Sequence, residues 1–247
     1  MSSAKKRLDE VLVSRGLVET RAKARALIMA GEVLVSETPA QKAGFLVADD
    51  AVIRVRTASK FVSRGGEKLA AALSRFSVDV SDSVCLDIGA STGGFTDCLL
   101  QRGAKKIYAI DVGYGQMHWK LQSDVRVIRM DRVNFRLIEV KSFPELVDVA
   151  VMDASFVSAA LLIPNLSALL KVNGMAIILV KPQFEVGKGA VGKGGIVRDE
   201  AKRLATVFSI RRTLEVNQLE VLGEMESPLR GGDGNVEYLL VGKKIGP

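Results

Sequence analysis

The second part of the chain alternates short apolar segments with helix-length segments, and this alternation limits the possible folds more than any other feature. Apolar strands are predicted over residues 84–88, 106–111, 125–130, 147–153, 175–180, 220–225 and 236–241, and helices over 95–102, 154–170 and 200–217. Strands that alternate with helices form a mostly parallel sheet covered on both faces. We therefore predict an α/β fold for this part of the chain.

The first 58 residues follow a different pattern. Apolar residues at helical spacing predict a helix over 6–15 that Gly16 ends, and Thr20 is placed to cap a second helix over 21–30. Residues 33–35 and 52–55 read as strands. We expect a small α+β domain over 1–58, a linker over 59–66 and the larger domain over 67–247.

Positive charge is concentrated at the start of the chain. The formal net charge is +7, and residues 1–60 hold 11 Lys and Arg against 7 Asp and Glu, a net of +4. Excess positive charge favours partners that carry phosphate. One His and two Cys argue against a zinc site and against a disulfide scaffold, so no metal is expected.

Nothing in the sequence predicts a membrane protein. The first residues, MSSAKKRLDE, lack the apolar run of a signal peptide. The uncharged run over 154–170 contains Pro164 and Asn165, so we interpret it as a buried helix. We expect a cytoplasmic protein without stable membrane association.

A glycine-rich turn follows the first predicted strand of the larger domain. The run from Asp87 to Phe95 has the form D-x-G-x-x-x-G-G, and Asp111 ends the next strand. Glycines bring the backbone close to a ligand, and a carboxylate at the next strand end can bind ribose hydroxyls. The spacing excludes a P-loop and favours an adenosine-type cofactor. The turn resembles the first motif of class I methyltransferases, which implies S-adenosylmethionine. The expected cofactor-binding residues are Asp87, Gly89, Ala90, Ser91, Thr92, Gly93, Gly94, Phe95, Asp111, Val112, Asp131 and Asp153.

Charged residues recur at the predicted strand ends. Asp153 ends one strand, Lys181 follows the next, and Glu237 opens the last, while Lys68 precedes the domain's first strand. Ligands bind at the carboxyl edge of open α/β sheets, so this edge is where these groups could meet.

In order, Lys68, Asp153, Lys181 and Glu237 match the Lys-Asp-Lys-Glu tetrad of FtsJ-like ribose 2′-O-methyltransferases. The whole chain resembles the TlyA (haemolysin A-like) family through SRGGEKL, DIGASTGGFTDCLL, DVGYGQMHWKL, KPQFE and GGIVRD. The resemblance implies a Rossmann-like class I methyltransferase domain that methylates a ribose in ribosomal RNA. It makes these four residues catalytic, with Lys181 as base or proton-steering group. Asp131 falls in a segment, DRVN, that departs from the family's usual form, which leaves its adenine contact open.

The small domain resembles an RNA-binding module shared by a small-subunit ribosomal protein, pseudouridine synthases and bacterial tyrosyl-tRNA synthetases. The resemblance rests on T-R-x-x-A-x-x-L-I-x-x-G-x-V-x-V from Thr20 to Val35. It implies that basic residues face the RNA backbone. The expected RNA-binding residues are Lys5, Lys6, Arg7, Arg21, Arg25 and Arg64, and the expected partner is ribosomal RNA or a ribosomal subunit.

Two other functions stay open. One is a membrane-active cytolysin, as the haemolysin name suggests, and the other is an RNA-binding ribosome assembly factor without catalysis. A glycine-rich stretch over 190–195, with Lys188 and Lys193, is either a loop over RNA or an ordinary flexible loop. The target nucleotide, the ribosomal subunit and the oligomeric state do not follow from the sequence.

Overall fold

The chain forms two compact units, Met1–Ser59 and Lys60–Pro247. The computed structural model describes residues 5–29, 31–40, 42–48, 50–55, 60–187, 189, 191, 192 and 194–246. Lys188 and Lys193 of the predicted glycine-rich loop lie outside these residues, as does position 59 of the predicted linker.

The N-terminal unit packs two helices against short strands. Its elements are β1 (Lys6–Arg7), α1 (Leu8–Ser14), α2 (Arg21–Met29), β2 (Val33–Val35), β3 (Thr38–Pro39), β4 (Leu46–Val47) and β5 (Ile53–Val55). The strands form a sheet of order β3-β2-β5 and a separate β1-β4 pair. The core contains Leu8, Leu12, Ala24 and Ile28, as the helical spacing predicted. The predicted cap is confirmed, because the Lys23 backbone N–H donates to Thr20 Oγ1 at 3.2 Å.

The larger unit is built on one seven-stranded sheet of order β11-β12-β10-β9-β6-β7-β8. Strands β6 to β10 are parallel, whereas β12 runs antiparallel to both β10 and β11. The strands are β6 (Val84–Ile88), β7 (Lys106–Asp111), β8 (Val127–Asp131), β9 (Val147–Met152), β10 (Leu170–Val180), β11 (Leu219–Glu226) and β12 (Tyr238–Lys244). The predicted mostly parallel α/β fold is confirmed.

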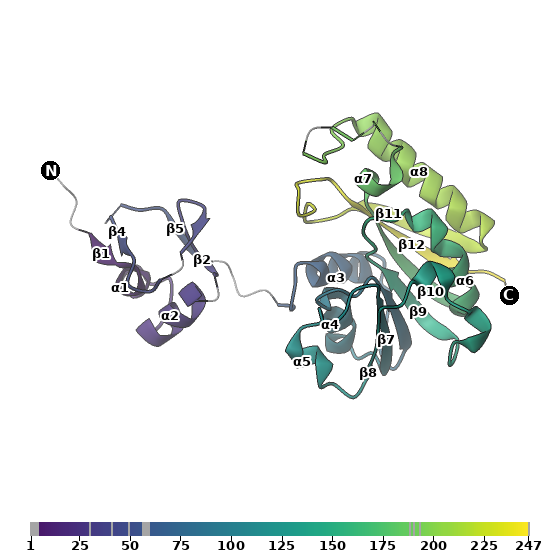
Figure 1. Ribbon diagram of the computed structural model, residues 1–247, viewed down its shortest axis with the longest axis horizontal. Coiled ribbons are helices and arrows are strands. Elements are labelled where there is room, and N and C mark those ends of the chain that lie inside the picture. The colour runs from purple at the N-terminus through teal and green to yellow at the C-terminus, as the bar shows by residue number, and fades with distance from the viewer. Residues whose placement is uncertain are drawn as a thin grey trace. The chain divides into compact units, whose positions relative to one another are not determined.

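Helices cover both faces of this sheet (Figure 1). They are α3 (Gly65–Arg75), α4 (Gly94–Gln101), α5 (Trp119–Gln122), α6 (Ile163–Leu169), α7 (Pro182–Glu185) and α8 (Glu200–Val216), with 3₁₀ turns at Phe135–Leu137, Val140–Ser142 and Ala159–Leu161. Successive strand residues point to opposite faces, so Cys85 packs with α3 and α4 while Leu86 packs with α6 and α8. No helix in the described part of the chain has the length and apolar character needed to span a bilayer.

Two helix predictions need correction. The predicted helix over 154–170 begins only with the 3₁₀ turn at Ala159, and α6 starts at Ile163 with Pro164 in its first turn, a position that proline tolerates. Phe156, with φ of +63°, has a left-handed backbone that a helix cannot contain. Helix α3 was not predicted, and its first residues overlap the predicted linker over 59–66.

Candidate active site

The sheet topology brings the strand-end residues to one edge. Gly89 follows β6, Asp111 ends β7, Asp153 follows β9 and Lys181 follows β10. Parallel strands present their carboxyl ends at the same edge. From β6 the sheet continues to β7 and β8 on one side and to β9 and β10 on the other, so the strand order reverses at β6. Open α/β sheets bind ligands at the carboxyl edge where the order reverses. Glu237 reaches the same edge because β12 is antiparallel and its Tyr238 pairs with Val180.

The four tetrad residues form two ion pairs. Lys68 Nζ on α3 lies 2.5 Å from Glu237 Oε2, and both side chains are at most one-tenth exposed. Lys181 Nζ lies 2.6 Å from Asp153 Oδ1. A buried charge is tolerated where a partner compensates it, and each lysine here has a carboxylate partner.

Ser155 belongs to the same cluster, although the sequence analysis did not identify it. Lys181 Nζ donates to Ser155 Oγ at 2.7 Å. The ammonium is therefore held from two sides, by a carboxylate and by a hydroxyl. A serine three residues beyond a strand end has no distinctive pattern, so only the three-dimensional arrangement reveals this contact.

Two cavities open along the sheet edge. The smaller, about 260 Å³, is lined by Ser63, Arg64, Gly65, Lys68, Gly89, Ala90, Ser91, Thr92, Gly94, Phe95, Asp153, Ser155 and Lys181. The larger, about 530 Å³, is lined by Ile88, Gly89, Ser91, Ile110, Asp111, Val112, Gln116, Val133, Asn134, Phe135, Arg136, Asp153, Ala154, Ser155, Phe156, Val157 and Leu162. The two cavities share Gly89, Ser91, Asp153 and Ser155, so a ligand in one can reach a ligand in the other.

The glycine turn needs glycine at two positions for different reasons. Gly89 has φ of +83°, and a Cβ there would lie 2.8 Å from the Asp153 carbonyl oxygen. Gly94 starts α4, and a Cβ there would collide with Ser63 Oγ. The backbone of the turn therefore lies directly against the strand end that carries Asp153, and the N-terminus of α4 faces the smaller cavity.

Asp87 lies behind the turn and contacts neither cavity. It is fully buried and accepts a hydrogen bond from Thr96 Oγ1 at 2.6 Å, while its Oδ1 has no partner among the described residues. Burial raises the pKa of Asp87 to about 7. In this arrangement Asp87 supports the glycine turn by joining β6 to Thr96 of α4.

Asp111 organises the loop after β7. Its Oδ2 accepts from the Ser91 backbone N–H and its Oδ1 from the Gly113 N–H, both at 2.7 Å. It lines the larger cavity next to Val112. Asp131 lines neither cavity and accepts from the Gly115 N–H at 3.2 Å, so its adenine contact stays a prediction.

The segment that enters α3 is fastened to α4. The Val62 backbone N–H donates to Asp97 Oδ2 at 2.8 Å, and Gln101 Nε2 donates to the Lys60 carbonyl at 2.9 Å. These bonds position Arg64, an expected RNA-binding residue, on the wall of the smaller cavity with its side chain exposed.

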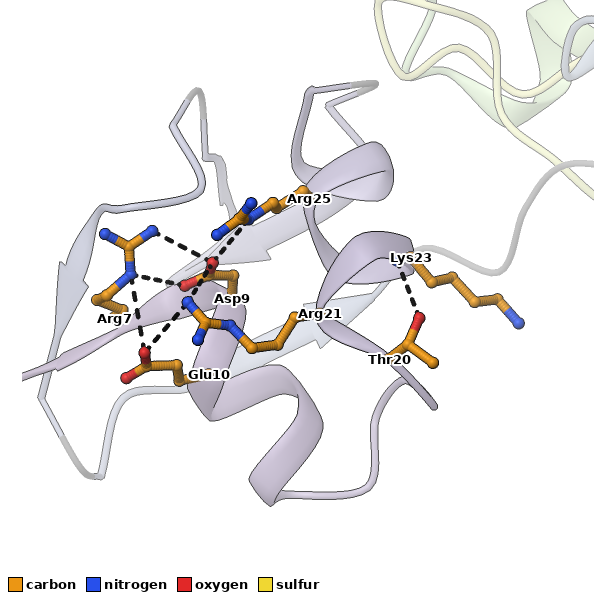
Figure 2. A network of polar contacts seen from close by, with 7 residues as sticks. All are labelled: Arg7, Asp9, Glu10, Thr20, Arg21, Lys23 and Arg25. Carbon is orange, nitrogen blue, oxygen red and sulfur yellow. Dashed lines mark hydrogen bonds and ion pairs between the residues drawn. The ribbon is translucent and has the colours of Figure 1, made fainter.

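The remaining expected RNA-binding residues lie in the N-terminal unit. Arg7, Arg21 and Arg25 converge on one carboxylate, that of Asp9, which is fully buried (Figure 2). Lys5 and Lys6 are exposed at the start of the same unit. The structure therefore gathers three of the five predicted residues of this unit into one cluster.

The larger cavity fits a nucleoside cofactor. Its volume is in the range of small-molecule sites, and it combines a carboxylate at one strand end with apolar walls from Ile110, Val133 and Leu162. The glycine turn lets the backbone approach without a clash. A doubly wound sheet with this turn and this carboxylate defines a fold of the Rossmann-like class, which binds nucleoside cofactors at this edge.

Comparison with known proteins agrees with this assignment. Residues 61–244 match the FtsJ-like methyltransferase family, and residues 6–53 match the S4 domain. A candidate rRNA methyltransferase of Bacillus subtilis (strain 168), YqxC, is 47% identical over 97% of this chain and 86% of the relative. The 16S/23S rRNA (cytidine-2'-O)-methyltransferase TlyA of Mycobacterium tuberculosis (strain ATCC 25618 / H37Rv) is 44% identical over 95% and 88%. A solved candidate hemolysin from Streptococcus thermophilus is 40% identical with a TM-score of 0.76, covering 98% of this chain and 89% of that chain.

The chain therefore belongs to the FtsJ-like methyltransferase family, in the TlyA group that carries an S4 domain before the enzyme domain. The predicted resemblance and the predicted cofactor, S-adenosylmethionine, are confirmed.

Substitution of Gly89 tests the turn. We expect Gly89→Ala to raise the Kd for S-adenosylmethionine at least tenfold, because a left-handed alanine costs about 1–2 kcal/mol and its Cβ meets backbone that cannot move aside. Titration calorimetry measures this. Gly187→Ala is the control, because Gly187 has open space around its Cα. Equal affinity of the two variants would contradict the assignment.

The raised pKa of Asp87 predicts a pH-dependent stability. Because the folded state binds this proton more tightly than the unfolded chain, its stabilisation is complete below pH about 4 and is lost as the pH rises through 7. Between pH 5 and 8, without cofactor, the melting temperature of the wild type should fall several degrees more than that of Asp87→Asn.

Asp79→Asn is the control for this comparison. Asp79 is exposed, and hydrogen bonds from Ser81 hold its pKa below the usual range, so it does not titrate between pH 5 and 8. Its melting curve should follow the wild type across the interval. Parallel curves for Asp87→Asn and the wild type would exclude the titration of Asp87.

Proposed function

We propose that this enzyme transfers the methyl group of S-adenosylmethionine to a ribose 2′-hydroxyl of ribosomal RNA. The observation that carries the proposal is a pair of lysine–carboxylate contacts at a small cavity next to the cofactor cavity. Lys68, Asp153 and Lys181 line this small cavity. The relatives named as rRNA methyltransferases support the same substrate. Such a substrate also favours the cytoplasm as the place of action.

The reaction needs an activated hydroxyl in line with the transferred methyl group. The cofactor supplies a methyl group on a sulfonium centre, which is a good leaving group, so positioning contributes much of the rate. The ribose hydroxyl is the poor reactant because it ionises only far above neutral pH. Lys181 takes this proton when its amine is neutral, or its ammonium donates to the hydroxyl oxygen while the Asp153 carboxylate accepts the proton. Asp153 and Ser155 hold the Lys181 nitrogen at 2.6 and 2.7 Å.

The second pair has an orienting role in this proposal. Lys68 is mostly buried against Glu237, and Gly231 leaves room for the Glu237 carboxylate, because a Cβ at Gly231 would lie 2.5 Å from Glu237 Oε1. A fixed lysine at the cavity wall can bind the phosphate next to the target ribose. Arg64 on the same wall can add a second phosphate contact.

Loss of Lys181 tests the mechanism. Lys181→Ala should lower methyl transfer to ribosomal subunits at least a hundredfold, because it removes the proton-steering group. The Kd for S-adenosylmethionine should stay within a few-fold, because the amine faces the smaller cavity. Transfer of radiolabelled methyl groups measures the rate. Lys171→Ala is the control, because Lys171 lies on β10, the strand that Lys181 follows, but pairs with Asp148. Full activity of Lys181→Ala would contradict the tetrad assignment.

Removal of the N-terminal unit tests whether this unit binds the RNA while the larger unit binds the cofactor. A fragment of residues 61–247 should bind S-adenosylmethionine normally but methylate subunits poorly, because the S4 domain supplies contacts to the RNA backbone. The measurement is kcat/KM for the fragment and the full chain. Equal values would assign RNA binding to the larger unit alone.

A membrane-active function is the second candidate, because a relative with 40% identity carries the name hemolysin. Release of dye from lipid vesicles by the purified chain, at concentrations that give methyl transfer, would support it.

A further inference from the structure

The N-terminal unit holds a buried acid where an RNA-binding surface is expected to be purely basic. Asp9 lies in the first turn of α1 and its side chain is fully buried. A lone buried carboxylate would be costly, so its surroundings must compensate the charge. The compensating groups are the same arginines that the sequence analysis assigned to RNA.

Three guanidinium groups share the Asp9 carboxylate. Arg7 donates from Nε at 3.0 Å and from Nη2 at 3.2 Å, Arg21 from Nη2 at 3.2 Å, and Arg25 from Nε at 3.1 Å. Figure 2 shows the three side chains reaching Asp9 from different sides: Arg7 comes from β1, and Arg21 and Arg25 come from successive turns of α2. One carboxylate therefore fixes cations from two elements that are distant in sequence.

The arginines stay available to a ligand while they are held. Their side chains are 42%, 47% and 54% exposed, in contrast to the buried Asp9. A guanidinium has five N–H donors, and each arginine uses only one or two of them on Asp9. The unused donors can bind phosphate oxygens.

Two neighbours reinforce the arrangement. Glu10 is half exposed, and its Oε1 lies 3.2 Å from Arg21 Nη2 and 3.9 Å from Arg7 Nε. Gly44 leaves space for Arg7, because a Cβ at Gly44 would lie 3.1 Å from Arg7 Nη1. Hydrogen bonds from Arg7 above all, and from Arg25 and Arg21, hold the pKa of Asp9 well below its usual range, so the carboxylate stays charged at any working pH.

We propose that Asp9, assisted by Glu10, is a positioning residue that aligns Arg7, Arg21 and Arg25 as one preformed binding site for RNA backbone phosphates. Without the acid, three like charges would repel one another and their long side chains would have to be ordered when RNA binds. Ordering them beforehand lowers that cost. The inference rests on the proposed RNA substrate but concerns binding, not chemistry.

This proposal predicts an effect opposite in sign to the change in charge. Asp9→Asn removes one negative charge, so the net charge of the unit rises by one. On charge alone this substitution should tighten RNA binding. With alignment lost, the full chain should instead bind an RNA hairpin at least fivefold more weakly at about 0.1 M salt. The slope of log Kd against log salt should also become shallower by about one, equivalent to one lost phosphate contact.

Glu19→Gln is the matched control. It adds the same charge on the same unit, but Glu19 is 82% exposed and contacts Lys23 outside the cluster. It should bind the hairpin as tightly as the wild type or slightly more tightly. Asp9→Asn binding as tightly as Glu19→Gln would overturn the proposal.

A second variant decides the question if Asp9→Asn unfolds the N-terminal unit, which circular dichroism would reveal. Glu10→Gln removes an exposed partner of Arg7 and Arg21 and leaves the core untouched. It should bind about twofold more weakly than Glu19→Gln. Binding as tight as that of Glu19→Gln would then overturn the proposal.

Methyl transfer to ribosomal subunits separates this inference from the proposed function. Folded Asp9→Asn enzyme should raise KM in parallel with the hairpin Kd and leave kcat within twofold, because the cluster is not part of the catalytic cavity. A fall in kcat with unchanged KM would overturn the positioning role. Absence of methyl transfer by the wild type would refute the proposed function, while the hairpin ranking would still decide the role of Asp9.

Discussion

The parallel register of the central strands is the constraint on which the active site depends. Because β6, β7, β9 and β10 run in the same direction, their carboxyl ends meet at one edge, and residues that are far apart in sequence become neighbours. The antiparallel β12 completes the set by bringing Glu237, which precedes it, to the same edge. The close contact of Gly89 with the Asp153 carbonyl then joins the glycine turn to the strand end that carries Asp153, so the two cavities share a wall.

The sequence predicted those parts of the structure that follow from periodicity and from strand order. The buried strands, the glycine turn and the positions of Asp153 and Lys181 at strand ends were all predictable, because each depends on a local pattern. Ser155 and the neighbours of Asp87 were not, because a hydroxyl beside a lysine depends on how two separate strands end. The start of α6 was mispredicted because a run of apolar residues does not reveal the left-handed backbone at Phe156.

The cluster around Asp9 shows a different limit. The sequence pattern identified basic residues on α2, but it did not show that Arg7, from a preceding strand, would share a buried acid with them. In the sequence, an acidic residue in a basic region only lowers the net positive charge. In the folded unit Asp9 also fixes the positions of three arginines, and only the three-dimensional contacts reveal this second effect.

The charge pairs of the two units differ in whether they leave a net positive charge that can attract RNA. The charges of the four tetrad residues cancel in pairs, so they add no net attraction for a polyanion. Among the described residues that line the smaller cavity, Arg64 is the one cation outside the tetrad. The N-terminal 60 residues carry +4 of the net charge of +7, and their three clustered arginines retain donors for phosphate. Backbone contacts of that kind carry little sequence information. In the proposed mechanism, selection of the target ribose depends on the shape and polar groups of the two adjoining cavities, where the hydroxyl has to reach Lys181 and the methyl group at once.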